Sequence, residues 1–276
     1  MAAPRVCVLR APGTNCDVET ACAFERAGAV AERIHLFRLL ENSRQLSQYQ
    51  ILCIPGGFSY GDDLGAGVIF SRQLRGELND VLREFLISDK LLLGICNGFQ
   101  TILKAGLIMR RGIERGDEPA AEVQLTLAWN SNGRYTDRWV RLKVTGSRNV
   151  FLSGLDEFDA PVAHAEGRIA LRRPELAEEL RAQAAIALCY WSPRAAALAA
   201  VSGDPTRIDL LPEPDNPNGS TGNIAGLSDS TGRVLGLMPH PERFLFATQH
   251  PQWTRSRMSG DGDGLRVFQN GVRYFS

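Results

Sequence analysis

The sequence predicts an α/β protein built on an open, mostly parallel sheet with helices on both faces. Continuously apolar runs alternate with amphipathic stretches through the N-terminal part of the chain, which is the pattern of strands buried between crossover helices. Glycine-rich turns follow two of these runs, at residues 55–57 and around Cys96. Because sites in such sheets form beyond the carboxyl ends of the strands, we expect any chemistry to gather at these two turns.

The first predicted elements alternate between strand and helix. Continuous apolar runs favour buried strands over residues 5–9, 29–35, 50–54 and 91–93. Apolar residues at helical spacing predict helices over residues 17–27, 70–86 and 99–105. Gly28 directly follows the first of these helices and suits its C-terminal end.

The second part of the chain is less regular. Residues 139–144 alternate like a half-exposed strand, and residues 185–190 and 234–238 have the pattern of buried strands. The segment 211–223 is rich in Pro, Gly and Asn and predicts a loop. There is no internal repeat and no long linker, so we expect a single domain over residues 1–276.

Composition excludes several classes of protein. Lys plus Arg and Asp plus Glu both number 31, so the formal net charge is zero and nothing suggests a nucleic-acid binder. No signal peptide and no apolar run of membrane-spanning length is evident, which predicts a cytoplasmic protein that does not enter a membrane. The six cysteines are scattered without CxxC spacing, so neither a disulfide framework nor a metal site is expected.

Cys96 is the strongest candidate for a catalytic residue. The run LLLGICNGFQ delivers it between two glycines at a predicted strand-to-helix turn, the arrangement of a nucleophile elbow. A helix N-terminus favours the thiolate over the thiol. Much later in the chain, His240 stands between two prolines and Glu242 follows, so a base and its orienting carboxylate are available. The alternative is a buried cysteine in a tight turn and an unrelated histidine.

A second constellation lies in the segment PGGFSYGDD at residues 55–63. The backbone N–H of Gly57 or Phe58, together with the N–H of Asn97, would form an oxyanion hole beside Cys96. An ordinary glycine turn is the alternative, and no phosphate-binding loop pattern is present.

Two further side chains are candidates for substrate binding. Gln100 follows Cys96 by about one helical turn and can face the same cleft, although a solvent-facing glutamine has the same spacing. His164, in the segment VAHAEG, is a second candidate, with a purely structural histidine as the alternative.

Taken together, these residues resemble the class I (triad) glutamine amidotransferases. The GxCxGxQ elbow and the late HxE of that family are matched by Gly94, Cys96, Gly98, Gln100, His240 and Glu242. The chain also resembles the glutaminase subunits of phosphoribosylformylglycinamidine synthases over longer segments: VLRAPGTNCD at 8–17, PGGFSYGDDLGAG at 55–67, NPNGS at 216–220, HPER at 240–243 and DGLRVFQNGVRY at 263–274. His164 matches an AHGEGR-like segment of the family, with Ala165 in place of a glycine. Residues 171–209 match nothing in it.

The resemblance implies a flavodoxin-like fold and a role for each candidate. Cys96 would be the nucleophile, His240 the general base and acid, and Glu242 its orienter. Gly57 or Phe58 would act with Asn97 on the oxyanion, and Gln100 and His164 would bind glutamine.

The resemblance also implies partners. The chain would bind no cofactor itself and would deliver ammonia to a synthetase subunit that uses ATP and magnesium, with a small subunit bridging the two. That synthetase would amidate formylglycinamide ribonucleotide in de novo purine biosynthesis. One rival is an amidotransferase that serves a different acceptor. A more distant rival is a cysteine-elbow protein of the same fold without amidotransferase activity.

Overall fold

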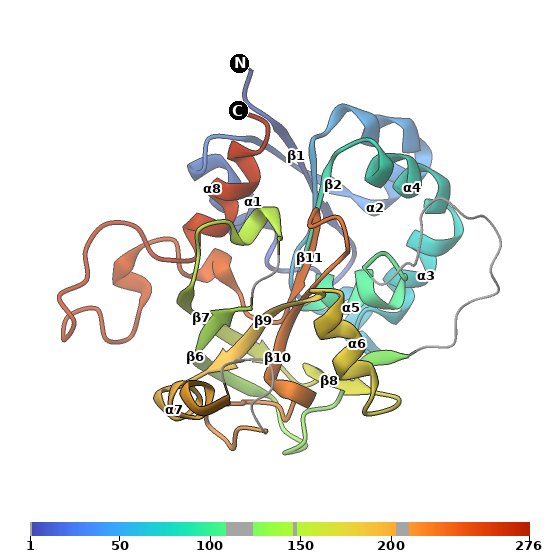
Figure 1. The fold of residues 1–276 in the computed structure, drawn as a ribbon. Helices are drawn as coiled ribbons and strands as arrows, with labels where there is room; N and C mark the ends of the chain where they lie inside the picture. The colour runs from blue at the N-terminus through green and yellow to red at the C-terminus, as the bar shows by residue number, and fades with distance from the viewer. Residues whose placement is uncertain (1, 109–123, 146–147, 203–209) are drawn as a thin grey trace.

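The computed structural model describes residues 2–108, 124–145, 148–202 and 210–276. Its main feature is a nine-stranded sheet in the order β2-β1-β3-β4-β11-β10-β9-β6-β7 (Figure 1). One half of the sheet is parallel and consists of β2 (Val30–His35), β1 (Arg5–Arg10), β3 (Ile51–Ile54), β4 (Leu91–Ile95) and β11 (Val234–Leu237). The predicted α/β class with a parallel sheet is therefore confirmed in this half.

The other half of the sheet is antiparallel. It consists of β10 (Ile224–Ser228), β9 (Ile186–Trp191), β6 (Thr136–Val144) and β7 (Glu157–His164). A separate two-stranded sheet pairs β5 (Leu125–Ala128) with β8 (Arg168–Leu171). The predicted strands 139–144, 185–190 and 234–238 correspond to β6, β9 and β11.

Helices cover both faces of the parallel half (Figure 1). On one face lie α1 (Asp17–Arg26) and α8 (Leu265–Arg273), joined by an edge-to-face contact of Phe24 and Phe268 at 4.9 Å between ring centroids. The opposite face carries α2 (Leu36–Glu41), α3 (Val68–Gly76), α4 (Asn79–Ile87) and α5 (Asn97–Lys104). Beside the antiparallel half lie α6 (Leu176–Ala182) and α7 (Pro193–Ser202). No helix within the described ranges is long and apolar enough to cross a membrane.

The helical pattern predicted over residues 70–86 is divided between two helices. Helix α3 ends at Gly76, and Leu78 has φ −108° and ψ 2° immediately before α4 begins. Glycine is among the poorest helix formers, so the chain turns there while Phe70, Leu74, Leu82 and Phe85 still reach the core.

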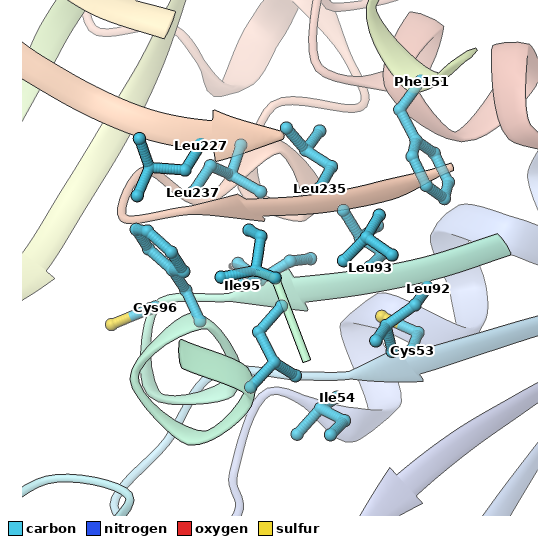
Figure 2. Packing of buried hydrophobic residues seen from close by; sticks show 14 of the residues in the cluster. Cys53, Ile54, Leu92, Leu93, Ile95, Cys96, Phe151, Leu227, Leu235 and Leu237 are labelled. Atoms are coloured by element: carbon cyan, nitrogen blue, oxygen red, sulfur yellow. The ribbon is translucent and has the colours of Figure 1, made fainter. Parts of the chain in front are cut away.

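The core follows the strands on both sides of the central pair β4 and β11. Leu93 and Ile95 from β4 and Leu235 and Leu237 from β11 are fully buried and lie side by side in Figure 2. One buried cluster extends from β1 to β9 and includes helices from both faces. On this continuity we propose that the chain is a single domain.

Helix α5 approaches β3 more closely than any side chain would permit. A Cβ on Gly98 would lie 1.8 Å from the carbonyl oxygen of Ile54, and a Cβ on Gly94 would lie 2.9 Å from the carbonyl oxygen of Gly98. The two glycines therefore allow α5 to begin directly against the strands, which fixes the position of the residue between them.

This contact makes a prediction about stability. Gly98→Ala should lower the free energy of unfolding by at least about 1–3 kcal/mol, because the new methyl group overpacks against backbone that cannot move aside. Denaturant titration measures the change. Gly76→Ala is the matched control, since a Cβ there meets nothing within 4 Å, and it should be neutral or stabilising by up to about 1 kcal/mol. Equal effects of the two substitutions would contradict this account of α5.

Candidate active site

Cys96 occupies the turn between β4 and α5 in a strained conformation. Its torsion angles are φ 50° and ψ −106°, a region that costs a non-glycine residue about 1–3 kcal/mol and is typical of functional turns. Its N–H donates to the carbonyl oxygen of Leu237 at 2.8 Å, and its carbonyl accepts from the N–H of Gln100 at 3.0 Å. Figure 2 shows the sulfur pointing away from the apolar core, and it lies 3.7 Å from the carbonyl oxygen of Ala163.

His240 and Glu242 reach the same place from the neighbouring strand. Strand β11 pairs with β4 so that Leu237 lies opposite Ile95. The chain then enters a short 3-10 turn (Pro241–Arg243) that carries Glu242. Nδ1 of His240 lies 2.6 Å from Oε1 of Glu242, and both residues are buried. The backbone N–H of His240 donates to the carbonyl oxygen of Pro161 in β7 at 2.8 Å, so β7 holds the backbone of His240 while Glu242 holds its imidazole.

The electrostatic surroundings of His240 favour its charged form. Burial alone lowers the pKa of His240, but the Glu242 carboxylate and the nearby Cys96 outweigh it and hold that pKa well above the usual value. Nε2 is buried and, among the described residues, has no hydrogen-bond partner. An imidazolium beside a thiol is the arrangement that stabilises a thiolate.

Two backbone N–H groups remain candidates for an oxyanion hole. Asn97 is the first residue of α5, where the helix leaves the N–H without an internal partner. Gly57 has φ 140°, and a Cβ there would lie 2.7 Å from the backbone nitrogen of Asn15, so only glycine fits. The N–H of Phe58 instead donates to the carbonyl oxygen of Gly13 at 3.0 Å. The geometry therefore favours Gly57 over Phe58.

The amide side chain of Gln100 is engaged by the protein at both ends. Its Nε2 donates to the carbonyl oxygen of Glu166 at 2.6 Å, and its Oε1 accepts from Nδ2 of Asn97 at 3.0 Å. Asn97 Nδ2 also donates to Oδ1 of Asp62 at 3.0 Å. Gln100 thus connects Glu166 with Asn97 in the wall of the site. Both polar atoms of its amide keep the capacity for a second hydrogen bond, so its binding of glutamine stays a prediction.

His164 is also buried in this wall. Asn130 donates its Nδ2 to the carbonyl oxygens of Arg134 and His164, both at 2.9 Å, so its Oδ1 must be the acceptor for Nδ1 of His164 at 3.1 Å. Burial, aided by the charge of His240, lowers the pKa of His164 to about 3. His164 is therefore neutral at physiological pH.

Cys96, Gln100 and His164 line a cavity of about 230 Å³, whereas His240 and Glu242 lie outside its lining. Its lining consists of Gly57, Phe58, Gly61, Asp62, Ala66, Cys96, Gln100, Trp129, Ala163, His164, Ala165 and Glu166. Because Cys96 lines the cavity, a substrate bound in it can meet the thiol directly.

Two carboxylates of the cavity were not selected from the sequence. Burial raises the pKa of Asp62, and the charge of Glu166 adds to this effect. Oε2 of Glu166 accepts from the N–H of Ala66 at 3.2 Å. Both residues lie in segments that the sequence marks as candidate sites, at 55–63 and around His164. Acidic residues are common in loops, however, and only the cavity distinguishes these two from the others.

Cys16 also lies beside the triad candidates, which its sequence position did not indicate. The polar atoms of Cys16, His240 and Glu242 lie within 4.8 Å of one another, and all three residues are buried. Cysteine, histidine and glutamate are the residue types that bind zinc.

Comparison with known proteins decides the family. The model of the CobB/CobQ-like glutamine amidotransferase domain matches residues 3–275. The chain belongs to this glutamine amidotransferase family. Among its relatives, a protein of Dehalococcoides mccartyi is 39% identical over 99% of this chain and 98% of that protein. Another, from Methanococcus maripaludis, is 37% identical over the same shares. Both are named phosphoribosylformylglycinamidine synthase subunit PurQ.

The fold of this amidotransferase also matches a solved assembly. A chain in the structure of PurLQS from Thermotoga maritima is 28% identical, with a TM-score of 0.69 and full coverage of both chains. A glutamine amidotransferase of the same organism is 14% identical with a TM-score of 0.50 and supports the fold alone.

The pKa of His240 leads to a prediction about pH. Glu242→Gln removes the carboxylate that most raises this pKa, so the imidazole should lose its proton at a lower pH. The alkaline limb of the glutamine hydrolysis profile should then move to lower pH, with a loss of kcat of roughly tenfold or more. Initial rates between pH 5 and pH 10 measure this. An unchanged limb, or one moved to higher pH, would show that Glu242 does not hold the proton on His240.

Proposed function

We propose that Cys96, His240 and Glu242 are the catalytic triad of the glutaminase subunit of a phosphoribosylformylglycinamidine synthase. The observation that carries the proposal is the pair of His240 and Glu242, 2.6 Å apart and buried, at the end of the strand beside the Cys96 turn. The relatives named PurQ align with this chain from end to end at 37–39% identity. That name assigns the subunit to the synthesis of phosphoribosylformylglycinamidine, a step of purine biosynthesis.

The chemistry follows from the order of these groups. The Cys96 thiolate attacks the side-chain carbonyl carbon of glutamine, and the oxyanion receives hydrogen bonds from the N–H groups of Asn97 and Gly57. The His240 imidazolium gives its proton to the departing nitrogen, so ammonia leaves and a glutamyl thioester remains. Neutral His240 then removes a proton from water, which hydrolyses the thioester to glutamate and restores the thiolate and the imidazolium.

The negative charge in the cavity wall supports glutamine as the substrate. Asp62 and Glu166 place negative charge in its wall, where the α-ammonium group of the substrate would be attracted. Gln100 and neutral His164 contribute to glutamine binding by fixing the wall, since Gln100 holds the carbonyl of Glu166. A neutral His164 adds no positive charge that would repel the ammonium group.

The released ammonia must be transferred to a second active site. In water it would be protonated and lost as a nucleophile, so the subunit delivers it to a synthetase subunit, and a small bridging subunit completes the assembly. The solved relative comes from such a PurLQS assembly. ATP and magnesium would be used by the synthetase subunit, which amidates formylglycinamide ribonucleotide, and this chain would need no cofactor. We place the complex in the cytoplasm.

The first experiment compares two nitrogen sources in the assembled synthase. Cys96→Ala and His240→Ala should each reduce glutamine-dependent product formation at least about a thousandfold, because nucleophile and base act as one unit. Ammonia-dependent formation should stay at the wild-type rate. Cys22→Ala, at an exposed free cysteine, is the control and should retain both activities. Retained glutamine use in Cys96→Ala would overturn the triad, and failure of the wild type to feed this acceptor would overturn the choice of synthase.

A second experiment tests the acidic wall. Glu166→Gln keeps an oxygen for the N–H of Ala66 but removes the charge, so KM for glutamine should rise roughly ten- to a hundredfold with a smaller change in kcat. Glu41→Gln is the control, because Glu41 lies in an exposed ion pair with Arg38. Steady-state kinetics of glutamine hydrolysis measure both variants. An unchanged KM would remove Glu166 from the substrate site.

A further inference from the structure

A second cysteine contacts the histidine of the triad. Cys16 immediately precedes α1 and is only 1% exposed. Its sulfur lies within 4.8 Å of a polar atom of both His240 and Glu242. The reaction described above uses Cys96 as its nucleophile and gives Cys16 no chemical step, so its place beside the imidazole needs another explanation.

The turn after β3 packs closely against one side of the imidazole. A Cβ on Gly56 would lie 2.7 Å from Cε1 of His240 and 3.2 Å from the sulfur of Cys16. The turn after β3 therefore closes on the ring and the thiol together, and no side chain fits between them. Because the N–H of Cys16 also donates to the carbonyl oxygen of Gly56 at 3.3 Å, the thiol is fixed relative to this turn.

Arg243 connects the same thiol to the turn that carries Glu242. Its Nη2 lies 3.2 Å from the sulfur of Cys16, and its Nε donates to Oε1 of Glu19 at 2.8 Å. The thiol S–H is directed to Oδ1 of Asn15 at 3.3 Å. Helix α1, through Cys16 and Glu19, thus holds the turn Pro241–Arg243 next to His240.

The state of the thiol follows from its burial. Burial raises the pKa of Cys16, against the opposing influence of His240 and Arg243, so the group stays an uncharged thiol and does not compete with Cys96. A zinc ion on Cys16, His240 and Glu242 would stand beside the Arg243 guanidinium and is opposed by its charge. The cluster is therefore suited to holding the imidazole and not to binding a metal.

We propose that Cys16 is a positioning residue for glutamine hydrolysis: with Arg243, it holds the His240 imidazole in place between Glu242 and Cys96. The proposal rests on the proposed glutaminase function. Glu242 fixes Nδ1, and the Cys16 thiol and Gly56 prevent the ring from tilting within its pocket. Small displacements of a catalytic group are costly, since a shift of about 1 Å can reduce a rate a hundredfold.

The test replaces the thiol in the assembled synthase. Cys16→Ala leaves space beside the ring and should lower kcat for glutamine about ten- to a hundredfold, with KM changed less than about threefold. The alkaline limb of its pH profile should move to lower pH, because a loosened imidazole loses part of its contact with Glu242. Cys16→Ser, which nearly restores the shape, should recover most of kcat. Ammonia-dependent activity should be unchanged in both variants.

Two further variants keep the test decisive. Cys7→Ala makes the same truncation at a fully buried cysteine of β1 and should lower stability without moving the pH profile. Arg243→Gln leaves Cys16 in place but removes its cationic partner, and should give an intermediate loss of kcat. Wild-type kcat and pH profile in Cys16→Ala, or equal loss of ammonia-dependent activity, would overturn the proposal. The proposed function itself is judged separately, by wild-type glutamine hydrolysis and its loss in Cys96→Ala.

Discussion

The close approach of α5 to the carboxyl end of β3 is the constraint on which the site depends. Because Gly98 has no side chain, the helix begins against the carbonyl of Ile54, and Cys96 is forced into its left-handed turn. The same geometry places the N–H of Asn97 beside the thiol. The Asn97 side chain then fastens the loop after β3, since its Oδ1 accepts from the N–H of Ser59 at 3.2 Å and its Nδ2 donates to Asp62. The candidate nucleophile, the candidate oxyanion donor and one wall of the cavity are thus all positioned by the start of α5.

The antiparallel half of the sheet supplies the opposite wall. Strand β7 contributes the carbonyl of Pro161, which fixes the backbone of His240, and the carbonyl of Ala163, which faces the Cys96 sulfur. Beyond it, the side chain of His164 is fixed by Asn130. The parallel half therefore carries the proposed catalytic residues, while the antiparallel half contacts and encloses them.

The features that can be predicted from this sequence are those that the local order of apolar residues and glycines determines. An apolar run that ends in glycine, cysteine and glycine specifies the elbow almost by itself, and the parallel strands follow from their continuous burial.

The choice between Gly57 and Phe58 depends on the carbonyl of Gly13, which is distant in sequence. The place of Cys16 beside His240 is equally a matter of tertiary structure: its segment 8–17 resembles the family, but the sequence does not show which residue the thiol contacts. The break between α3 and α4 was missed because apolar spacing continues across it. The unmatched segment 171–209 contains the strand β9 and, in its described part, the helices α6 and α7.

The pairing of β4 with β11 affects the order in which the candidate site is assembled during synthesis of the chain. Ribosomal synthesis runs from the N-terminus, so the cysteine at position 96 emerges long before the histidine at position 240. Strand β11 fills the position between β4 and β10 in the finished sheet. A nascent chain therefore carries the candidate nucleophile before the histidine that is proposed as its base has been synthesised. The candidate site is completed only when β11, close to the C-terminus, has been synthesised and has paired between β4 and β10.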